Sequence, residues 1–458
     1  MWSPRSPVRG KARKFWTADT KIAFLAVLSR IVILTFSVLL DRAIPDHNPD
    51  ASVARPPDAL ALPPQLLAFT RWDAAHFLQL AHFGYQEEKD FAFFPFLPLA
   101  INGLARVLHV QLSWGFSLLL SGLLITNGCF VLSAWLLFRL GLAVLKDQIL
   151  AFNAARVFCL SPANIFFSTI YTESPFAACT FGALLLLHMD RFYFSAVLFA
   201  IGSGLRSNGL VNIGFLACHV LVSTLKQIRQ ANSASFKPWN RAALRLMVGV
   251  IVVFSPFIAF QTFAVWKACD RDGQQTVCDK GQEQCAVSAE PPSWCQYSIP
   301  SAYSHIQAKY WQGGFLRYWQ LKQIPNFLLA FPALSLTAAG VFYLFMDFVK
   351  ELQREADKKG SKQSTYLTCV LVLHVALVRC PLFPHAVHWG FLAVYVFFFA
   401  NVQISTRLLA SACPVFHWFL ASLVFDRSQY FRQKLLQLYI GLYNLLGVSM
   451  HVNFLPWT

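Results

Sequence analysis

Long apolar runs recur along this chain and constrain its fold more than any other feature. The first covers residues 22–40, and others cover 114–138, 246–266 and 324–346. A helix of about 20 residues crosses the roughly 30 Å hydrocarbon core of a bilayer and satisfies its own backbone hydrogen bonds there, whereas strands with open edges do not. With 56% hydrophobic and 13% charged residues, the chain is predicted to be an all-α, polytopic membrane protein of about 10 or 11 transmembrane helices.

Two further crossings are expected over residues 149–170 and 366–378. No repeat of 20 to 50 residues and no soluble accessory segment is visible, so residues 1–458 are interpreted as a single integral membrane domain. The side on which the last helices emerge is left open by the sequence.

The formal charge of +16 indicates membrane topology and not nucleic-acid binding, because the basic residues fall in short segments between apolar runs. Six of them precede the first run, which lacks a small-residue cleavage pattern and is typical of an uncleaved anchor. The amino terminus is therefore expected to be cytosolic. The same charge rule places two polar loops, residues 41–113 and 267–322, on the opposite, lumenal side.

Within the first loop, residues 71–81 mix apolar and polar side chains in a pattern that predicts a short helix lying in the membrane interface. The second loop contains four cysteines, at positions whose spacing does not match common zinc sites. An oxidising lumen favours disulfides among them, with three possible pairings. These residues are Cys269, Cys278, Cys285 and Cys295.

Asp73 is the leading catalytic candidate, because an ionisable side chain beside apolar segments requires a structural or functional reason. No basic residue lies three or four positions away to form a local helical ion pair. A helix-capping role is the structural alternative. The functional interpretation is a general base that points into a cavity.

Glu173 and Arg206 are the next candidates. Glu173 lies in YTESP, where Thr172 or Glu173 could cap a helix that has Pro175 in its first turn. Arg206 lies in LRSNG, between two apolar pieces. Its guanidinium could bind two phosphate oxygens with parallel hydrogen bonds. The alternative for Arg206 is a structural ion pair with Glu173 or Asp73.

Other polar and aromatic residues of the predicted lumenal side could line the same cavity and bind substrate. A metal site at His385 and His388 is weakly supported, because no third ligand is near in sequence. The sequence has no nucleotide-binding loop, and we expect no metal or other cofactor. The candidates are Arg71, Trp72, His76, Asn164, Tyr171, Asn208, Gln307, His385, His388 and Trp389.

Six blocks together resemble the GPI mannosyltransferase 2 (PIG-V) family. The resemblance extends from about Lys21 to the final LPWT, and one departure from the family's usual N-P-[AS] pattern is Ser161-Pro162-Ala163. The blocks are RWDAAHFLQLAHFGY with AFFPFLPL, SPANIFFSTIYTES, LRSNG, WCQYSIPSAYSHIQAKYW, IPNFLLAFP and PHAVHW.

The resemblance implies a GT-C glycosyltransferase of the endoplasmic reticulum membrane that acts on the lumenal side. Such an enzyme takes mannose from dolichyl-phosphate mannose and adds the second mannose, α-1,6-linked, to the GPI-anchor precursor. In GT-C enzymes an acidic residue of the first lumenal loop is the usual candidate base, and Asp73 occupies that position. The resemblance implies lipid-linked donor and acceptor as partners, and it leaves any partner subunit unidentified.

Two other classes remain as alternatives. A transporter or lipid scramblase would also keep charges near a cavity, but it predicts internal repeats and broken helices near the midplane. A non-catalytic subunit of a glycosylation complex would tolerate the loss of Asp73.

Overall fold

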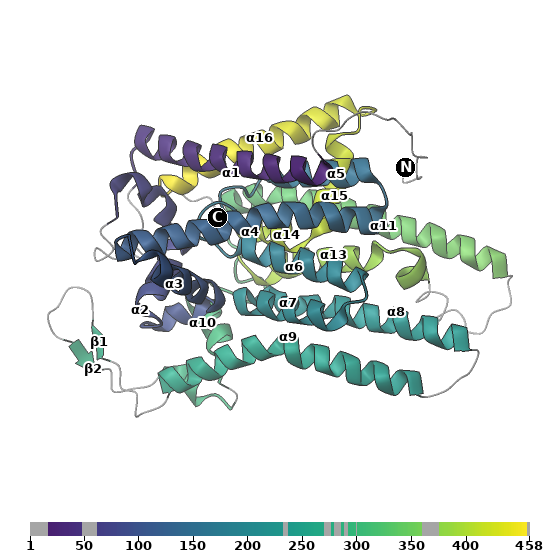
Figure 1. The fold of residues 1–458 in the computed structure, drawn as a ribbon, viewed down its shortest axis with the longest axis horizontal. Helices are drawn as coiled ribbons and strands as arrows, with labels where there is room; N and C mark the ends of the chain where they lie inside the picture. Colours follow the sequence, from purple (N-terminus) through teal and green to yellow (C-terminus); the bar gives the residue numbers. More distant parts are fainter. Residues whose placement is uncertain are drawn as a thin grey trace.

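Long apolar helices make up most of the protein and run side by side along its longest axis (Figure 1). The computed structural model describes residues 17–47, 62–231, 237–269, 276–278, 285–287, 292–298, 300–359 and 375–455. Among these, six helical segments are long and apolar enough to cross a membrane. They contain α1 (Ala18–Ala43), α4 (Trp114–Leu145), α8 (Ile213–Ala231), α9 (Lys237–Cys269), α11 (Ile324–Lys359) and α16 (Tyr430–Val452).

A bent pair of helices supplies a further candidate crossing. Helix α14 (Ser405–Ala412) and helix α15 (Pro414–Val424) meet at 92°, because Pro414 has no backbone N–H and cannot continue α14. The remaining apolar helices are too short to span about 30 Å at 1.5 Å per residue. They are α3 (Phe96–Leu108), α5 (Gln148–Cys159), α6 (Glu173–His188), α7 (Phe192–Leu205) and α13 (Phe383–Phe399).

The all-helical membrane architecture is thus confirmed, whereas the individual crossings differ from expectation. The crossing predicted over residues 149–170 is wrong, because α5 ends at Cys159 and residues 160–172 form turns. Pro162 explains the break, since proline disfavours helical geometry in the residue before it. The crossing predicted over 366–378 falls largely outside the described residues.

Short elements gather at one end of the bundle (Figure 1). The short helix predicted within residues 71–81 is confirmed as α2 (Asp73–Phe83), and its position in the membrane interface stays a prediction. It is accompanied by α10 (Ala302–Tyr310) and a two-stranded antiparallel ribbon, β1 (Thr276–Cys278) with β2 (Cys285–Val287). The chain also contains short 3-10 helices: η2 (Pro64–Thr70), η3 (Glu88–Ala92), η4 (Ser207–Asn212), η6 (Ser293–Gln296) and η7 (Leu321–Gln323).

Helix α4 is central to the packing, since it contacts α1, α3, α5 and α6. The last helix, α16, packs beside α1 (Figure 1). Its carboxyl end reaches the start of α2, where the Trp72 indole N–H donates to the His451 carbonyl oxygen at 3.1 Å. The sequence did not predict at which end of the bundle the last helix terminates. The contact with Trp72 places its carboxyl end beside α2. Two further short helices, η8 (Val375–Arg379) and η9 (Val402–Ile404), flank α13.

Candidate active site

Asp73 is the first residue of α2, and its position depends on an unusual backbone conformation just before it. Trp72 has φ 56° and ψ −129°, a region that costs a non-glycine residue about 1–3 kcal/mol. The Trp72 indole is held by the His451 carbonyl, and the Asp73 backbone N–H donates to the Tyr171 hydroxyl at 3.3 Å. Strain retained in this way indicates that the orientation of Asp73 is functionally constrained.

Glu173 begins α6 and is fully buried. Its Oε1 forms an ion pair with Arg206 Nη1, which also donates to the Thr172 hydroxyl at 3.2 Å. Thr172 makes no side-chain capping bond to α6 within the described chain, so the capping interpretation of this residue is not supported. The structural alternative for Arg206, a pair with Glu173, is the arrangement observed.

Arg407 connects the two carboxylates. Its Nη1 donates to Asp73 Oδ2 at 3.0 Å and lies 3.4 Å from Glu173 Oε1. The guanidinium carbon is 5.1 Å from the Phe166 ring and 5.4 Å from the Tyr171 ring, within range of cation–π attraction. Sequence reasoning missed Arg407, although a single arginine inside the apolar run 402–424 was a usable signal.

The resulting cluster pairs two carboxylates with two arginines, but the carboxylates differ in accessibility. The Asp73 side chain is 30% exposed and the Glu173 side chain is 0% exposed. A general base must reach the hydroxyl from which it takes a proton. The geometry therefore suits Asp73 for that role and Glu173 for fixing the arginines.

His76 lies one helical turn after Asp73 and stacks on Phe93, with ring centroids 4.5 Å apart. Burial lowers the pKa of His76, although the negative charge of Asp73 opposes this shift. The imidazole is therefore neutral near pH 7 and does not add a cation to the cluster. Its Nδ1 has no hydrogen-bond partner in the part of the chain that the structure describes.

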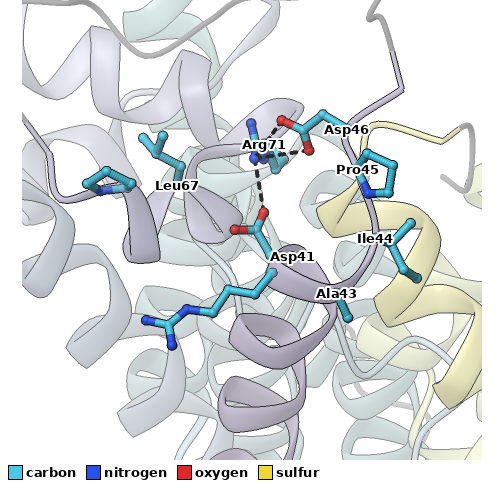
Figure 2. A pocket seen from close by; sticks show the side chains of 9 residues that line it. Asp41, Ala43, Ile44, Pro45, Asp46, Leu67 and Arg71 are labelled. Atoms are coloured by element: carbon cyan, nitrogen blue, oxygen red, sulfur yellow. Dashed lines mark hydrogen bonds and ion pairs between the residues drawn. The ribbon is translucent and has the colours of Figure 1, made fainter.

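Arg71 faces away from Asp73. Its Nη2 lies 3.0 Å from Asp41 Oδ1 and 3.1 Å from Asp46 Oδ2, at a pocket formed by the end of α1 and η2 (Figure 2). The guanidinium carbon is also 4.4 Å from the Phe454 ring. This arginine therefore joins α1 to the segment before α2, and the prediction that it serves the same site as Asp73 is not supported by its position.

Asn164 belongs to a second buried cluster, centred on Arg30 of α1. Arg30 donates from Nη1 to the Asn164 carbonyl oxygen at 3.2 Å and to Ser168 Oγ at 2.6 Å, and from Nη2 to Asn164 Oδ1. Asn164 Nδ2 donates to Asn444 Oδ1 on α16 at 2.7 Å. These contacts hold the irregular segment 160–172, so Asn164 acts in the fold and not in the carboxylate cluster.

Asn208 and Gln307 differ in their relation to the carboxylate cluster. Asn208 Oδ1 accepts from Arg206 Nε at 3.3 Å, which places Asn208 beside the cluster. Gln307 is half-buried on α10, where its carbonyl oxygen accepts from the Gly313 N–H at 2.9 Å. Only Asn208 thus contacts the residues that hold Glu173.

His385, His388 and Trp389 do not converge on Asp73. Both histidines pack against Phe215, and His385 lies close to His188 at the far end of α6, about 22 Å from Glu173 at 1.5 Å per residue. The fully buried Trp389 contacts Phe416 and Phe419. The expectation that the PHAVHW block completes the site is wrong, because α13 directs these rings into helix–helix packing.

The four cysteines of the second polar loop include one disulfide, Cys269–Cys295, which joins the end of α9 to η6. Cys278 and Cys285 are opposite each other in the register of β1 and β2. Of the three possible pairings, the observed bond leaves only Cys278 with Cys285 for a second one, which stays a prediction.

Glu88 of η3, in the first polar loop, binds three side chains of the second polar loop, and we call this set of contacts the Glu88 clasp. It was not predicted from the sequence. Its carboxylate accepts from Trp294 Nε1 at 3.1 Å, from the Tyr310 hydroxyl at 2.8 Å, and from Lys309 Nζ. Burial alone would raise the pKa of Glu88, but the hydrogen bonds from Lys309 and Tyr310 outweigh it and lower the pKa. The ion pair also raises the pKa of Lys309.

Across the described ranges, no three His, Cys, Asp or Glu side chains are grouped so that they could hold a metal ion. The two carboxylates have arginine partners instead.

Comparisons with known proteins match nearly the whole chain to one family. The family described as Mannosyltransferase (PIG-V) matches residues 20–458. The chain is 34% identical to GPI alpha-1,6-mannosyltransferase 2 of Cricetulus griseus over 97% of this chain and 100% of that protein. It is 32% identical to the Homo sapiens protein of that name, with 100% of both covered.

Among solved structures, the oligosaccharyltransferase of Archaeoglobus fulgidus aligns with a TM-score of 0.41 at 13% identity. The alignment covers 94% of this chain and 55% of that chain, and the similarity is too low to support an inference. The match to the family and the identity to full-length relatives are sufficient by themselves: the chain belongs to the Mannosyltransferase (PIG-V) family.

Proposed function

We propose that this protein is a GPI α-1,6-mannosyltransferase that transfers mannose from dolichyl-phosphate mannose to the GPI-anchor precursor as its second mannose. The observation that carries the proposal is the full-length similarity to proteins named GPI alpha-1,6-mannosyltransferase 2. The cluster around Asp73 supports it with suitable chemistry. Family membership favours a transferase over a transporter, a scramblase or a non-catalytic subunit.

Asp73 would act as the general base in a direct displacement. The acceptor hydroxyl oxygen forms a bond to the anomeric carbon of mannose while the bond from that carbon to the phosphate oxygen breaks. The hydroxyl proton passes to Asp73, and dolichyl phosphate leaves with the electron pair of the broken bond. One displacement inverts the anomeric carbon, which converts a β-linked donor into an α-linked product.

Arginine side chains would offset the charge of the departing phosphate. Arg206 and Arg407 both lie at the carboxylates, and a guanidinium matches two phosphate oxygens with parallel hydrogen bonds. Preorganised charges of this kind stabilise a developing anion more strongly in a partly dry site than in water. The proposed reaction therefore has a source of positive charge that does not involve a metal cofactor.

The proposed location is the endoplasmic reticulum membrane with the active site in the lumen. Asp73 lies at the start of α2, at the end of the bundle that also carries α10 and the ribbon (Figure 1). The linkers expected in the cytosol, by contrast, carry basic residues such as Lys146, Arg191 and Lys226. This orientation puts the amino terminus in the cytosol.

The decisive experiment supplies the purified full-length protein with dolichyl-phosphate mannose and a monomannosyl GPI precursor. We expect a dimannosyl product with an α-1,6 linkage, identified by mass spectrometry and linkage-specific mannosidase digestion. A preparation that binds both lipids without forming this product would contradict the proposal. Omitting the donor provides the background for the measurement.

A further inference from the structure

The ion pair between Arg407 and Asp73 engages one oxygen of the residue that we assign as the base. Arg407 Nη1 donates to Asp73 Oδ2 at 3.0 Å, before any substrate is bound. A carboxylate has two acceptor oxygens, and a general base uses a lone pair directed at the hydroxyl. An anion that took Arg407 would therefore make Oδ2 available as well.

The two arginines of the cluster differ in how readily a ligand can take them. Arg206 is bound to Glu173, Thr172 and Asn208. Displacing it would leave a carboxylate with 0% exposure unpaired, which is costly in a buried setting. Arg407 is 3.0 Å from Asp73 Oδ2 and 3.4 Å from Glu173 Oε1. If Arg407 leaves, Glu173 keeps its pair with Arg206, and the 30% exposed side chain of Asp73 regains water. A phosphate is thus expected to compete for Arg407 first.

Arg407 can exchange partners without moving far. The Phe166 and Tyr171 rings flank its guanidinium, and its Nε is buried without a hydrogen-bond partner among the described residues. The guanidinium therefore has one N–H without a partner among the described residues, and its contacts with the two rings do not depend on Asp73. Arg30 and Arg71 also have an unpartnered Nε and a ring contact, so the feature that distinguishes Arg407 is its bond to Asp73, the partly exposed candidate base.

We propose that Arg407 binds the phosphate of the lipid-linked donor and thereby releases Asp73 from its ion pair. The proposal rests on the proposed function, because it takes Asp73 as the base. Donor binding then makes both carboxylate oxygens available to the acceptor hydroxyl when the mannose to be transferred is in place. No covalent bond changes in this step; one ion pair is exchanged for another.

The test measures binding of dolichyl phosphate to the purified full-length protein and requires no turnover. Asp73→Asn removes the competitor for Arg407 and is expected to bind the probe about 3-fold more tightly than wild type, the size of a partly exposed ion pair. Arg407→Gln is expected to bind at least about 10-fold more weakly. Arg407→Lys, which keeps the charge without the planar fork, should lie between them.

Asp41→Asn is the matched control, because Asp41 pairs with Arg71 and not with Arg407. Its affinity for dolichyl phosphate measures any gain in binding that comes merely from removing one negative charge. Equal affinities for Asp73→Asn and Asp41→Asn would overturn the proposal, and so would wild-type affinity in a folded Arg407→Gln. If Arg407→Gln does not fold, the Asp73→Asn comparison decides by itself.

The outcomes separate this inference from the proposed function. If wild type binds dolichyl phosphate and the variants do not differ, the role of Arg407 is wrong while the transferase assignment stands. If wild type does not bind dolichyl phosphate, the donor class is wrong and the inference fails with it.

Discussion

Arg30 and Arg407 are both buried arginines in apolar helices, yet their surroundings differ in kind. Arg30 is bound by neutral groups among the described residues, namely carbonyl oxygens, hydroxyls and the Asn164 amide. Arg407 is bound by Asp73 and Glu173, and both arginines keep a buried Nε without a hydrogen-bond partner among the described residues. The difference thus lies in the charge of the partners: neutral groups hold Arg30 in the fold, whereas Arg407 lies between carboxylates of unequal exposure and is the arginine that we propose changes partners.

The largest expected effect tests the Arg407 cluster. Asp73→Asn keeps the side-chain shape but cannot accept the acceptor proton, so we expect mannose transfer to fall by about 10²- to 10⁴-fold with normal expression. Cells that lack the endogenous activity and carry this variant should accumulate the precursor with one mannose. Surface GPI-anchored proteins, measured by flow cytometry, report the outcome.

Asp41→Asn is the control for this loss, since it changes a carboxylate at the same end of the bundle but outside the cluster. It should restore surface GPI-anchored proteins. Restoration by Asp73→Asn to the level of wild type would show that the base has been assigned to the wrong residue.

The next effect tests the Arg30 cluster. Arg30→Met leaves Asn164 and Ser168 without their buried donor, at about 1–3 kcal/mol for each unsatisfied group. We expect a loss of roughly 3 kcal/mol in the free energy of unfolding, and a lower expression level. The dolichyl phosphate affinity of the folded fraction should stay near that of wild type.

Arg139→Met is a suitable comparison, because Arg139 is about half exposed and pairs with Asp19 at 3.4 Å. Its stability should change by less than about 1 kcal/mol. If the two variants lose equal stability, the distinction between a buried cluster and an exposed ion pair does not apply to this protein.

The smallest effect concerns the Glu88 clasp, in which the partner Lys309 has a half-exposed side chain. Because the folded pKa of Glu88 lies below its ordinary value of 4.5, the clasp contributes stability above pH 4.5 that is lost as the pH falls through the folded value. Hydrogen exchange of residues 302–310 should therefore accelerate on acidification. Glu88→Gln should exchange faster than wild type at neutral pH and show little further change on acidification.

Much of the fold could be predicted from the sequence because lipid permits few solutions. Apolar runs long enough to cross a bilayer must be helical, so α1, α4, α9 and α11 were anticipated, although α9 and α11 extend well beyond the predicted runs 246–266 and 324–346. The motif around Asp73 could likewise be singled out by one costly carboxylate. The break after Cys159 was missed, since residues 149–170 are mostly apolar and hydropathy does not register the effect of Pro162.

The sequence by itself determined the helical membrane class, the family resemblance and the importance of Asp73. Only the tertiary structure decided which charges meet. Arg71 is two residues from Asp73 but pairs with Asp41, while Arg407 pairs with Asp73 from 334 positions away. Local patterns register the cost of placing a charge in lipid, but the partner that offsets this cost is chosen by how distant helices pack.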